Sequence, residues 1–131
     1  MAKVVGVGGV FLDFKGEKEK VHQFYKEHLG LEMTEYGSGF LMGEQLMLLS
    51  FKRDLAQVPL INFRVDNLEE VIRTLRNENL QTDEIIEYPY GKFAHFTDPF
   101  GNYIELWEAD VNAYKEMVLK EIESYKISKE K

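Results

Sequence analysis

His95 and Glu105 are two residues near the end of the chain whose types and spacing could move a proton. Between them, residues 98–101 read Asp-Pro-Phe-Gly, which is typical of a tight turn because proline presets the backbone and glycine accepts a positive φ. Strands should therefore flank this turn. If residues 99–101 form a three-residue loop with a glycine bulge, residue 98 faces residue 102. Counting back along the ladder then places His95 opposite Glu105.

Three roles are open for this pair. In the first, His95 and Glu105 form a cross-strand hydrogen bond, so that the carboxylate fixes the ring and is itself satisfied. In the second, Glu105 raises the basicity of His95, which then removes a proton next to a carbonyl group as a general base. In the third, the two side chains simply contact a ligand.

The elements around the pair are predicted to form two copies of one β-α-β-β-β unit, offset by about 50 residues. In the first copy, apolar residues at helical spacing predict a helix over residues 17–29. Short apolar segments separated by glycine turns predict its strands at residues 10–14, 31–36, 40–42 and 46–51.

The second copy begins with a predicted strand at residues 60–65. Its helix is opened by Asn67 with Glu70 three positions on, which is a capping-box arrangement. Three more strands are predicted at residues 84–88, 93–97 and 102–107. A last helix over residues 110–126 carries a complete apolar stripe, which must cover either its own sheet or a second subunit.

Composition limits the classes of function. The chain has 131 residues, a net charge of −7, no cysteine and no apolar run approaching the roughly 20 residues of a membrane span. We therefore expect a single soluble domain over residues 1–131, cytoplasmic, with no membrane association. The acidic charge disfavours nucleic acid as a partner. The lack of cysteine excludes disulfides and thiolate metal sites, so that any metal would need His, Asp or Glu ligands.

Three motifs, in this order and spacing, carry a resemblance to a known family. They are Phe-Tyr at residues 24–25, Leu-Gly-Leu at residues 29–31, and Asp-Pro-x-Gly-Asn-x-Ile-Glu-Leu at residues 98–106. Together with the two β-α-β-β-β halves, they resemble the vicinal oxygen chelate superfamily, the group of glyoxalases, bleomycin-resistance proteins and ring-cleaving dioxygenases. The resemblance covers about residues 4–108.

The resemblance implies an α+β fold in which each module curls four strands into half of a cup. Module one would span residues 4–52 and module two residues 58–108, giving a curved eight-stranded mixed sheet with the helices outside and a concave face for the ligand. Metal-dependent members bind a divalent ion through the first and fourth strands of each module. The matching positions here are Gly9, Leu48, Leu60 and Glu105, of which only Glu105 can coordinate a metal. We therefore expect no divalent metal cofactor.

Alternation along the strands predicts which side chains line the cup. If the Glu105 side chain faces into the cup, so do the residues two positions before and after it on the same strand. The residues beside these positions on neighbouring strands also face into the cup. The resulting wall of aromatic rings with a few polar groups is typical of a small-molecule pocket. Besides Glu105 and His95, the expected ligand-binding residues are Phe11, Asp13, Leu48, Leu60, Asn62, Arg64, Phe93, Tyr103 and Trp107.

Arg64 has two possible roles. It pairs with Asp13 or Glu105, or it anchors a carboxylate of the ligand, since its planar fork suits both uses. The leading hypothesis is a metal-independent binder of a small organic ligand, acting as a homodimer. One alternative is a lyase or isomerase of glyoxalase type, similar to lactoylglutathione lyase, that uses Glu105 and His95. Another is a structural or regulatory module whose cup is filled by its own side chains.

Overall fold

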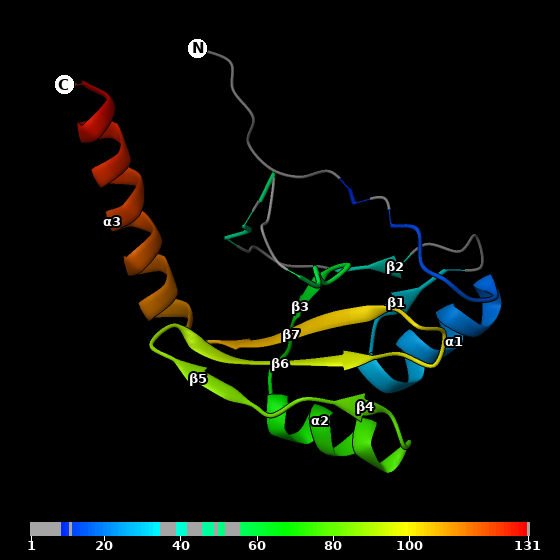
Figure 1. Ribbon diagram of the computed structural model, residues 1–131. Helices are drawn as coiled ribbons and strands as arrows, with labels where there is room; N and C mark the ends of the chain where they lie inside the picture. Colours follow the sequence, from blue (N-terminus) through cyan, green and yellow to red (C-terminus); the bar gives the residue numbers. More distant parts are fainter. Residues whose placement is uncertain are drawn as a thin grey trace.

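The computed structural model describes residues 9–10, 12–34, 39–41, 46–48, 50–51 and 56–130 (Figure 1). The described elements, in chain order, are α1 (Lys18–Leu29), β1 (Glu32–Met33), β2 (Gly39–Phe40), β3 (Asn62–Arg64), α2 (Leu68–Asn77), β4 (Gln81–Thr82), β5 (Ile86–Tyr88), β6 (Gly91–Thr97), β7 (Tyr103–Ala109) and α3 (Val111–Glu130).

The main sheet has five strands in the order β3-β7-β6-β4, with β5 also paired to β6. Strand β3 runs parallel to β7, and the other pairings are antiparallel, so that the sheet is mixed. Strands β1 and β2 form a separate two-stranded antiparallel sheet. The predicted α+β class with a mixed sheet is confirmed.

Helices α1 and α2 cover one face of the main sheet and enclose the core (Figure 1). Helix α2 begins at the predicted cap, where the Asn67 side chain accepts a hydrogen bond from the Glu70 backbone N–H at 3.1 Å. Helix α1 ends at Gly30, which adopts the left-handed conformation with φ 69°. The buried side chains between the helices and the sheet are Val21, Phe24, Tyr25, Leu68, Ile72, Leu75, Ala94, Phe96, Ile104 and Leu106.

Helix α3 extends away from the end of β7 and does not lie along the sheet (Figure 1). Tyr114, in its first turns, is buried, whereas residues 119–128 are exposed. Leu119 and Ile122, for example, keep 54% and 44% of their surface exposed. Within the described residues, the apolar stripe therefore does not cover its own sheet beyond Tyr114. No helix in this part of the chain is long and apolar enough to cross a membrane.

The first module differs from the prediction. Residues 12–14 and 46–48 were expected in strands but are irregular, and Leu48 is 69% exposed. A strand needs a neighbouring strand that forms hydrogen bonds with its backbone N–H and C=O groups. No described strand pairs with either of these segments. The described residues therefore do not form an eight-stranded cup. Phe11 lies outside the described residues. Strand β4, which pairs with the end of β6, was not predicted because two residues are too short for a pattern.

Candidate functional site

The turn between β6 and β7 sets the register of the site. Asp98 Oδ1 accepts hydrogen bonds from the backbone N–H groups of Phe100 at 2.9 Å and Asn102 at 2.8 Å. Gly101 has φ 94°, a conformation that favours glycine, and the Asp98 backbone N–H donates to the Asn102 carbonyl at 2.9 Å. The predicted three-residue loop is confirmed, and with it the pairing of His95 with Glu105 in the antiparallel ladder.

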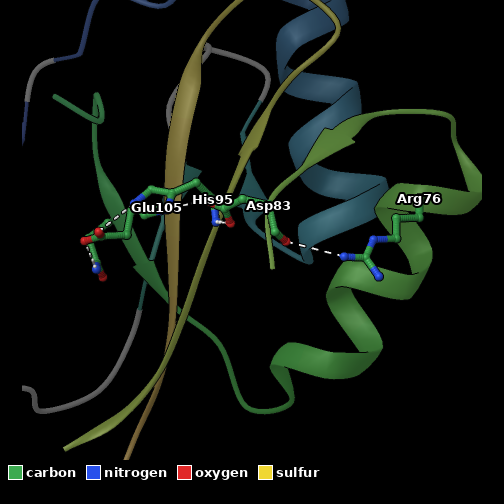
Figure 2. Close-up of polar contacts among 5 residues, drawn as sticks. Arg76, Asp83, His95 and Glu105 are labelled. Carbon is green, nitrogen blue, oxygen red and sulfur yellow. Dashed lines mark hydrogen bonds and ion pairs between the residues drawn. The ribbon is translucent and has the colours of Figure 1, made fainter. Parts of the chain in front are cut away.

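The His95 ring lies between two carboxylates (Figure 2). Its Nε2 atom is 2.9 Å from Glu105 Oε2, as expected for a cross-strand pair. Its Nδ1 atom is 2.8 Å from Asp83 Oδ2, a contact that the sequence did not predict. Both ring nitrogens are thus occupied, so that His95 has no nitrogen left to take a proton from a ligand unless one contact breaks.

Asp83 holds His95 through the backbone as well as the ring. Its Oδ1 atom accepts the His95 backbone N–H at 2.6 Å, and its own N–H donates to the His95 carbonyl at 3.1 Å. The Arg76 side chain from α2 donates to the Asp83 carbonyl at 3.4 Å (Figure 2). It also donates to Thr82 Oγ1 at 2.8 Å. Asp83 is therefore fixed at the end of β4, and it fixes His95 in turn.

Glu105 is the least exposed acidic group of the site, with 14% of its side chain exposed. Its Oε1 atom accepts a 2.7 Å hydrogen bond from Asn62 Nδ2 on the neighbouring strand β3. The Tyr103 ring stacks on the His95 ring, with centroids 5.1 Å apart. Burial raises the pKa of Tyr103, and the negative charges of Asp83 and Glu105 raise it further.

A cavity of about 180 Å³ opens beside the His95 ring. Its walls come from β4, β6 and β7 and from the segment before β3, and they are mostly polar. The lining residues are Gln57, Gln81, Thr82, Asp83, His95, Phe96, Thr97 and Tyr103. Because an engineered cavity of about 150 Å³ can hold benzene, this volume suits a small organic molecule.

The other end of the same face is filled by the protein's own rings. Phe93 stacks on Trp107 with centroids 5.5 Å apart, and Tyr114 of α3 meets Trp107 edge-on at 4.6 Å. The Trp107 Nε1–H donates to the Tyr90 carbonyl at 3.2 Å. Only 8% of Trp107 remains exposed. Phe93 and Trp107, both expected to contact a ligand, therefore contact one another, and Trp107 also contacts α3.

Arg64 forms neither of the internal pairs that were considered. Within the described residues, Arg64 forms no ion pair or hydrogen bond with Asp13, with Glu105 or with any other residue. It lines a second, open cavity of about 330 Å³ at the start of α3, together with Asp66, Glu108 and Val111. The remaining expected ligand-binding residues Asp13, Leu48 and Leu60 are exposed, and none of them lines the cavity beside His95.

Neither protein-family models nor curated protein sequences match this chain. Solved structures do match it. The antibiotic-binding protein TnmS3 from Streptomyces sp. CB03234 aligns over 82% of this chain and 100% of its own, with 21% identity and a TM-score of 0.55. The genomically encoded fosfomycin resistance protein FosX from Listeria monocytogenes aligns over 85% and 98%, with 13% identity and a TM-score of 0.55. The trypanothione-dependent glyoxalase I of Leishmania major aligns over 91% and 95%, with 20% identity and a TM-score of 0.51.

These structures have the fold that the three sequence motifs predict. The chain has the fold of the vicinal oxygen chelate superfamily. At these identities the likeness concerns the arrangement of the elements, so the chemistry of this protein depends on its own side chains.

The metal chemistry of the vicinal oxygen chelate superfamily needs several donors that point at one ion. Here Asp83 and Glu105 contact opposite nitrogens of one ring, so that these two carboxylates and His95 do not converge on one point. Across the part of the chain that the structure describes, no group of three or more His, Asp or Glu side chains could hold a metal ion. The side chains that the structure describes around His95 do not fit a divalent ion.

Asp83, Gln57, Gln81 and Thr97 line the cavity of this candidate site and were missed by sequence reasoning. Asp83, Gln81 and Thr97 reach the cavity through β4 or through the end of β6 beside it. No pattern in the sequence marks the two-residue strand Gln81–Thr82 that precedes Asp83.

Proposed function

We propose that this protein binds a small organic molecule in the cavity beside His95, without a resident metal ion. The observation that carries the proposal is the cavity itself, about 180 Å³ in volume and lined by Asp83, His95 and Tyr103. Small-molecule sites combine a concave shape with a few placed polar groups, and here those groups are held rigidly by one another. TnmS3, a structure of similar fold, is an antibiotic-binding protein, which supports a binding role.

A cavity-filling substitution tests this proposal. Gln81 is an exposed residue of β4 that lines the cavity, so Gln81→Trp should block it while leaving the His95 contacts in place. Gln23→Trp is the matched control, because Gln23 is exposed on α1, at the helix-covered side of the sheet. Small aromatic probes, followed by the chemical shifts of His95 and Tyr103, should bind the wild type and the control but not Gln81→Trp. Equal binding by both variants, or none by the wild type, contradicts the proposal, and the second result favours the structural module.

The absence of a resident metal has its own test. Protein purified without chelators should contain less than stoichiometric zinc, nickel, iron or manganese by elemental analysis. A stoichiometric metal that disappears in Glu105→Gln would show that Glu105 is a ligand and that the proposal is wrong.

A second candidate function is a lyase or isomerase of glyoxalase type that uses Glu105, although Glu105 does not line the cavity beside His95. Asn62 and His95 each hold one oxygen of this carboxylate, and each oxygen keeps a lone pair that could accept a proton. In this function Glu105 is the base and His95 positions it, which reverses the roles considered from the sequence. The test is turnover of a 2-oxoaldehyde with a thiol cofactor: wild type and Gln23→Trp should be active and Glu105→Gln at least about 100-fold slower, as for loss of a general base. No turnover by the wild type excludes it.

We also propose that the protein is a homodimer and that residues of both modules complete the eight-stranded cup. Helix α3 has 20 residues, and isolated helices gain most of their stability from packing. Its residues Leu119, Ile122 and Ile127 are exposed among the described residues, and a second copy of α3 suits them because three lysines and three glutamates balance over residues 115–126.

The dimer is tested by its mass in solution. The double variant Leu119→Glu, Ile122→Glu should convert a dimer into a folded monomer in light-scattering chromatography, because it places charges on the apolar stripe. Lys18→Glu, a change of the same kind at an exposed position of α1, should leave the dimer intact. A monomeric wild type, or a dimer that survives the double variant, contradicts this arrangement.

A further inference from the structure

The cluster formed by Asp83, His95 and Glu105 joins one imidazole to two carboxylates, at 2.8 Å and 2.9 Å. A neutral imidazole can donate to one of the two carboxylates, and an imidazolium can donate to both. Two ionised carboxylates outweigh the charge of one ring in either form. The three side chains together are therefore a source of negative charge.

Among the described residues, no lysine or arginine lines the cavity, and the ionisable groups of its lining are Asp83, His95 and Tyr103. The Arg76 guanidinium donates from α2 to Thr82 Oγ1 and to the Asp83 carbonyl but is not a lining residue. Arg64 lines the other cavity. The remaining polar groups are the Gln57 and Gln81 amides and the hydroxyls of Thr82, Thr97 and Tyr103, each of which has an oxygen that can accept a hydrogen bond.

Tyr103 lines the cavity beside these carboxylates. Burial raises the pKa of its hydroxyl, and the charges of Asp83 and Glu105 raise it further. The two carboxylates differ in access, since 49% of the Asp83 side chain is exposed against 14% for Glu105. A ligand in the cavity can therefore reach Asp83 directly, while Glu105 contributes its charge from behind the ring.

We propose that the cavity selects organic cations, such as a protonated amine on a small aromatic or aliphatic body, and that Asp83 contacts the cationic group. This inference rests on the proposed binding function and names the class of its ligand. Each Asp83 oxygen uses one lone pair on His95, so each keeps one for a donor from the ligand. A carboxylate or phosphate on the ligand would meet the same field with the opposite sign and would be repelled.

Three probes of nearly equal size test the proposal: benzylamine, benzyl alcohol and benzoate at neutral pH. Binding is measured from the chemical shifts of His95 and Tyr103. Benzylamine should bind most tightly and benzoate most weakly, and added salt should weaken the binding of benzylamine alone. Asp83→Asn keeps the shape of the side chain and should weaken benzylamine by about fivefold, the factor for loss of one partly exposed ion pair.

Asp66→Asn is the matched control, because it removes the same charge from an exposed residue outside this cavity. It should leave the affinity for benzylamine unchanged. Equal affinity for benzylamine and benzyl alcohol, tighter binding of benzoate, or equal losses in Asp83→Asn and Asp66→Asn would overturn the preference for cations. If benzyl alcohol binds and Gln81→Trp abolishes that binding, the proposed function survives this failure. If none of the probes binds the wild type, both fail.

Discussion

The Tyr25 hydroxyl donates a 2.8 Å hydrogen bond to Asp98 Oδ2, although 73 positions separate the two residues. Both side chains are buried, and the bond joins α1 to the turn between β6 and β7. Asn102 adds two contacts, donating its side-chain amide to Asp98 Oδ2 at 2.9 Å and to the Lys15 carbonyl at 2.9 Å. The Asp-Pro-x-Gly-Asn motif thus acts as a structural anchor, and it supports the site by holding the hairpin that carries His95 and Glu105.

Tyr25→Phe should change the stability of the protein at alkaline pH. Burial raises the pKa of Tyr25 above its ordinary 10.0, and the hydrogen bond to Asp98 and the charge of Asp98 raise it further. A group with a raised folded pKa contributes stability that is complete below its unfolded pKa and is lost as pH rises towards the folded value. Urea unfolding should show a wild type that loses stability above pH 10.0 and a variant with a shallower loss.

At neutral pH the same variant should be about 1–2 kcal/mol less stable, because Asp98 loses one of its donors. Tyr88→Phe, at an exposed position of β5, is the control and should keep the wild-type profile. Parallel alkaline profiles for wild type and Tyr25→Phe would mean that Tyr25 is not the group responsible.

Asp98→Ala should be among the most destabilising single substitutions. It leaves four donors without their acceptor: the Tyr25 hydroxyl, the backbone N–H groups of Phe100 and Asn102, and the Asn102 side-chain amide. Loss of such a buried network costs about 3–5 kcal/mol, which thermal or urea unfolding measures. Asp66→Ala, at an exposed position, should cost less than about 0.5 kcal/mol. A similar cost for both variants would contradict the anchoring role.

Gly91→Ala should destabilise the β5–β6 hairpin for two reasons. Gly91 has φ 135°, and a Cβ atom there would collide with the Glu108 carbonyl oxygen and lie 2.5 Å from Trp107 Nε1. Gly30→Ala separates the two effects, because Gly30 also has a positive φ, of 69°, but open space around its Cβ. We expect a loss of about 1 kcal/mol for Gly30→Ala and of more than about 2 kcal/mol for Gly91→Ala in urea unfolding. Equal losses would show that the collision relaxes at no cost.

Tyr114→Ala should expose the single tryptophan of the chain. Tyr114 packs edge-on against Trp107, which is buried despite lying on the face opposite the helices. Removal of the ring should shift the Trp107 fluorescence to longer wavelength and lower stability by about 2–4 kcal/mol. Tyr125→Ala, further along α3 where the chain is exposed, should leave the spectrum unchanged. An unchanged spectrum in Tyr114→Ala would mean that α3 does not cover Trp107.

Much of the second module could be predicted because its signals are local. The cap at Asn67 and the turn at residues 98–101 depend on neighbours within a few positions. Side-chain alternation then follows from strand geometry, so that Ile104 and Leu106 face the helices while Glu105 faces away. Asp83 could not be placed in the same way, because its contact with His95 depends on a two-residue strand that has no pattern of its own.

The sequence by itself determined the order of the helices, the hairpin and the pairing of His95 with Glu105, since turn chemistry and residue periodicity act over short stretches of chain. Only the tertiary structure decided which end of the sheet face is open. Tyr114 covers Trp107 at one end of this sheet face, because α3 leaves β7 in a direction that brings the Tyr114 ring against Trp107. Asp83 contacts the His95 ring on the side opposite Glu105 because β4 pairs with the end of β6. These contacts join segments far apart in sequence, and packing rather than local pattern sets them.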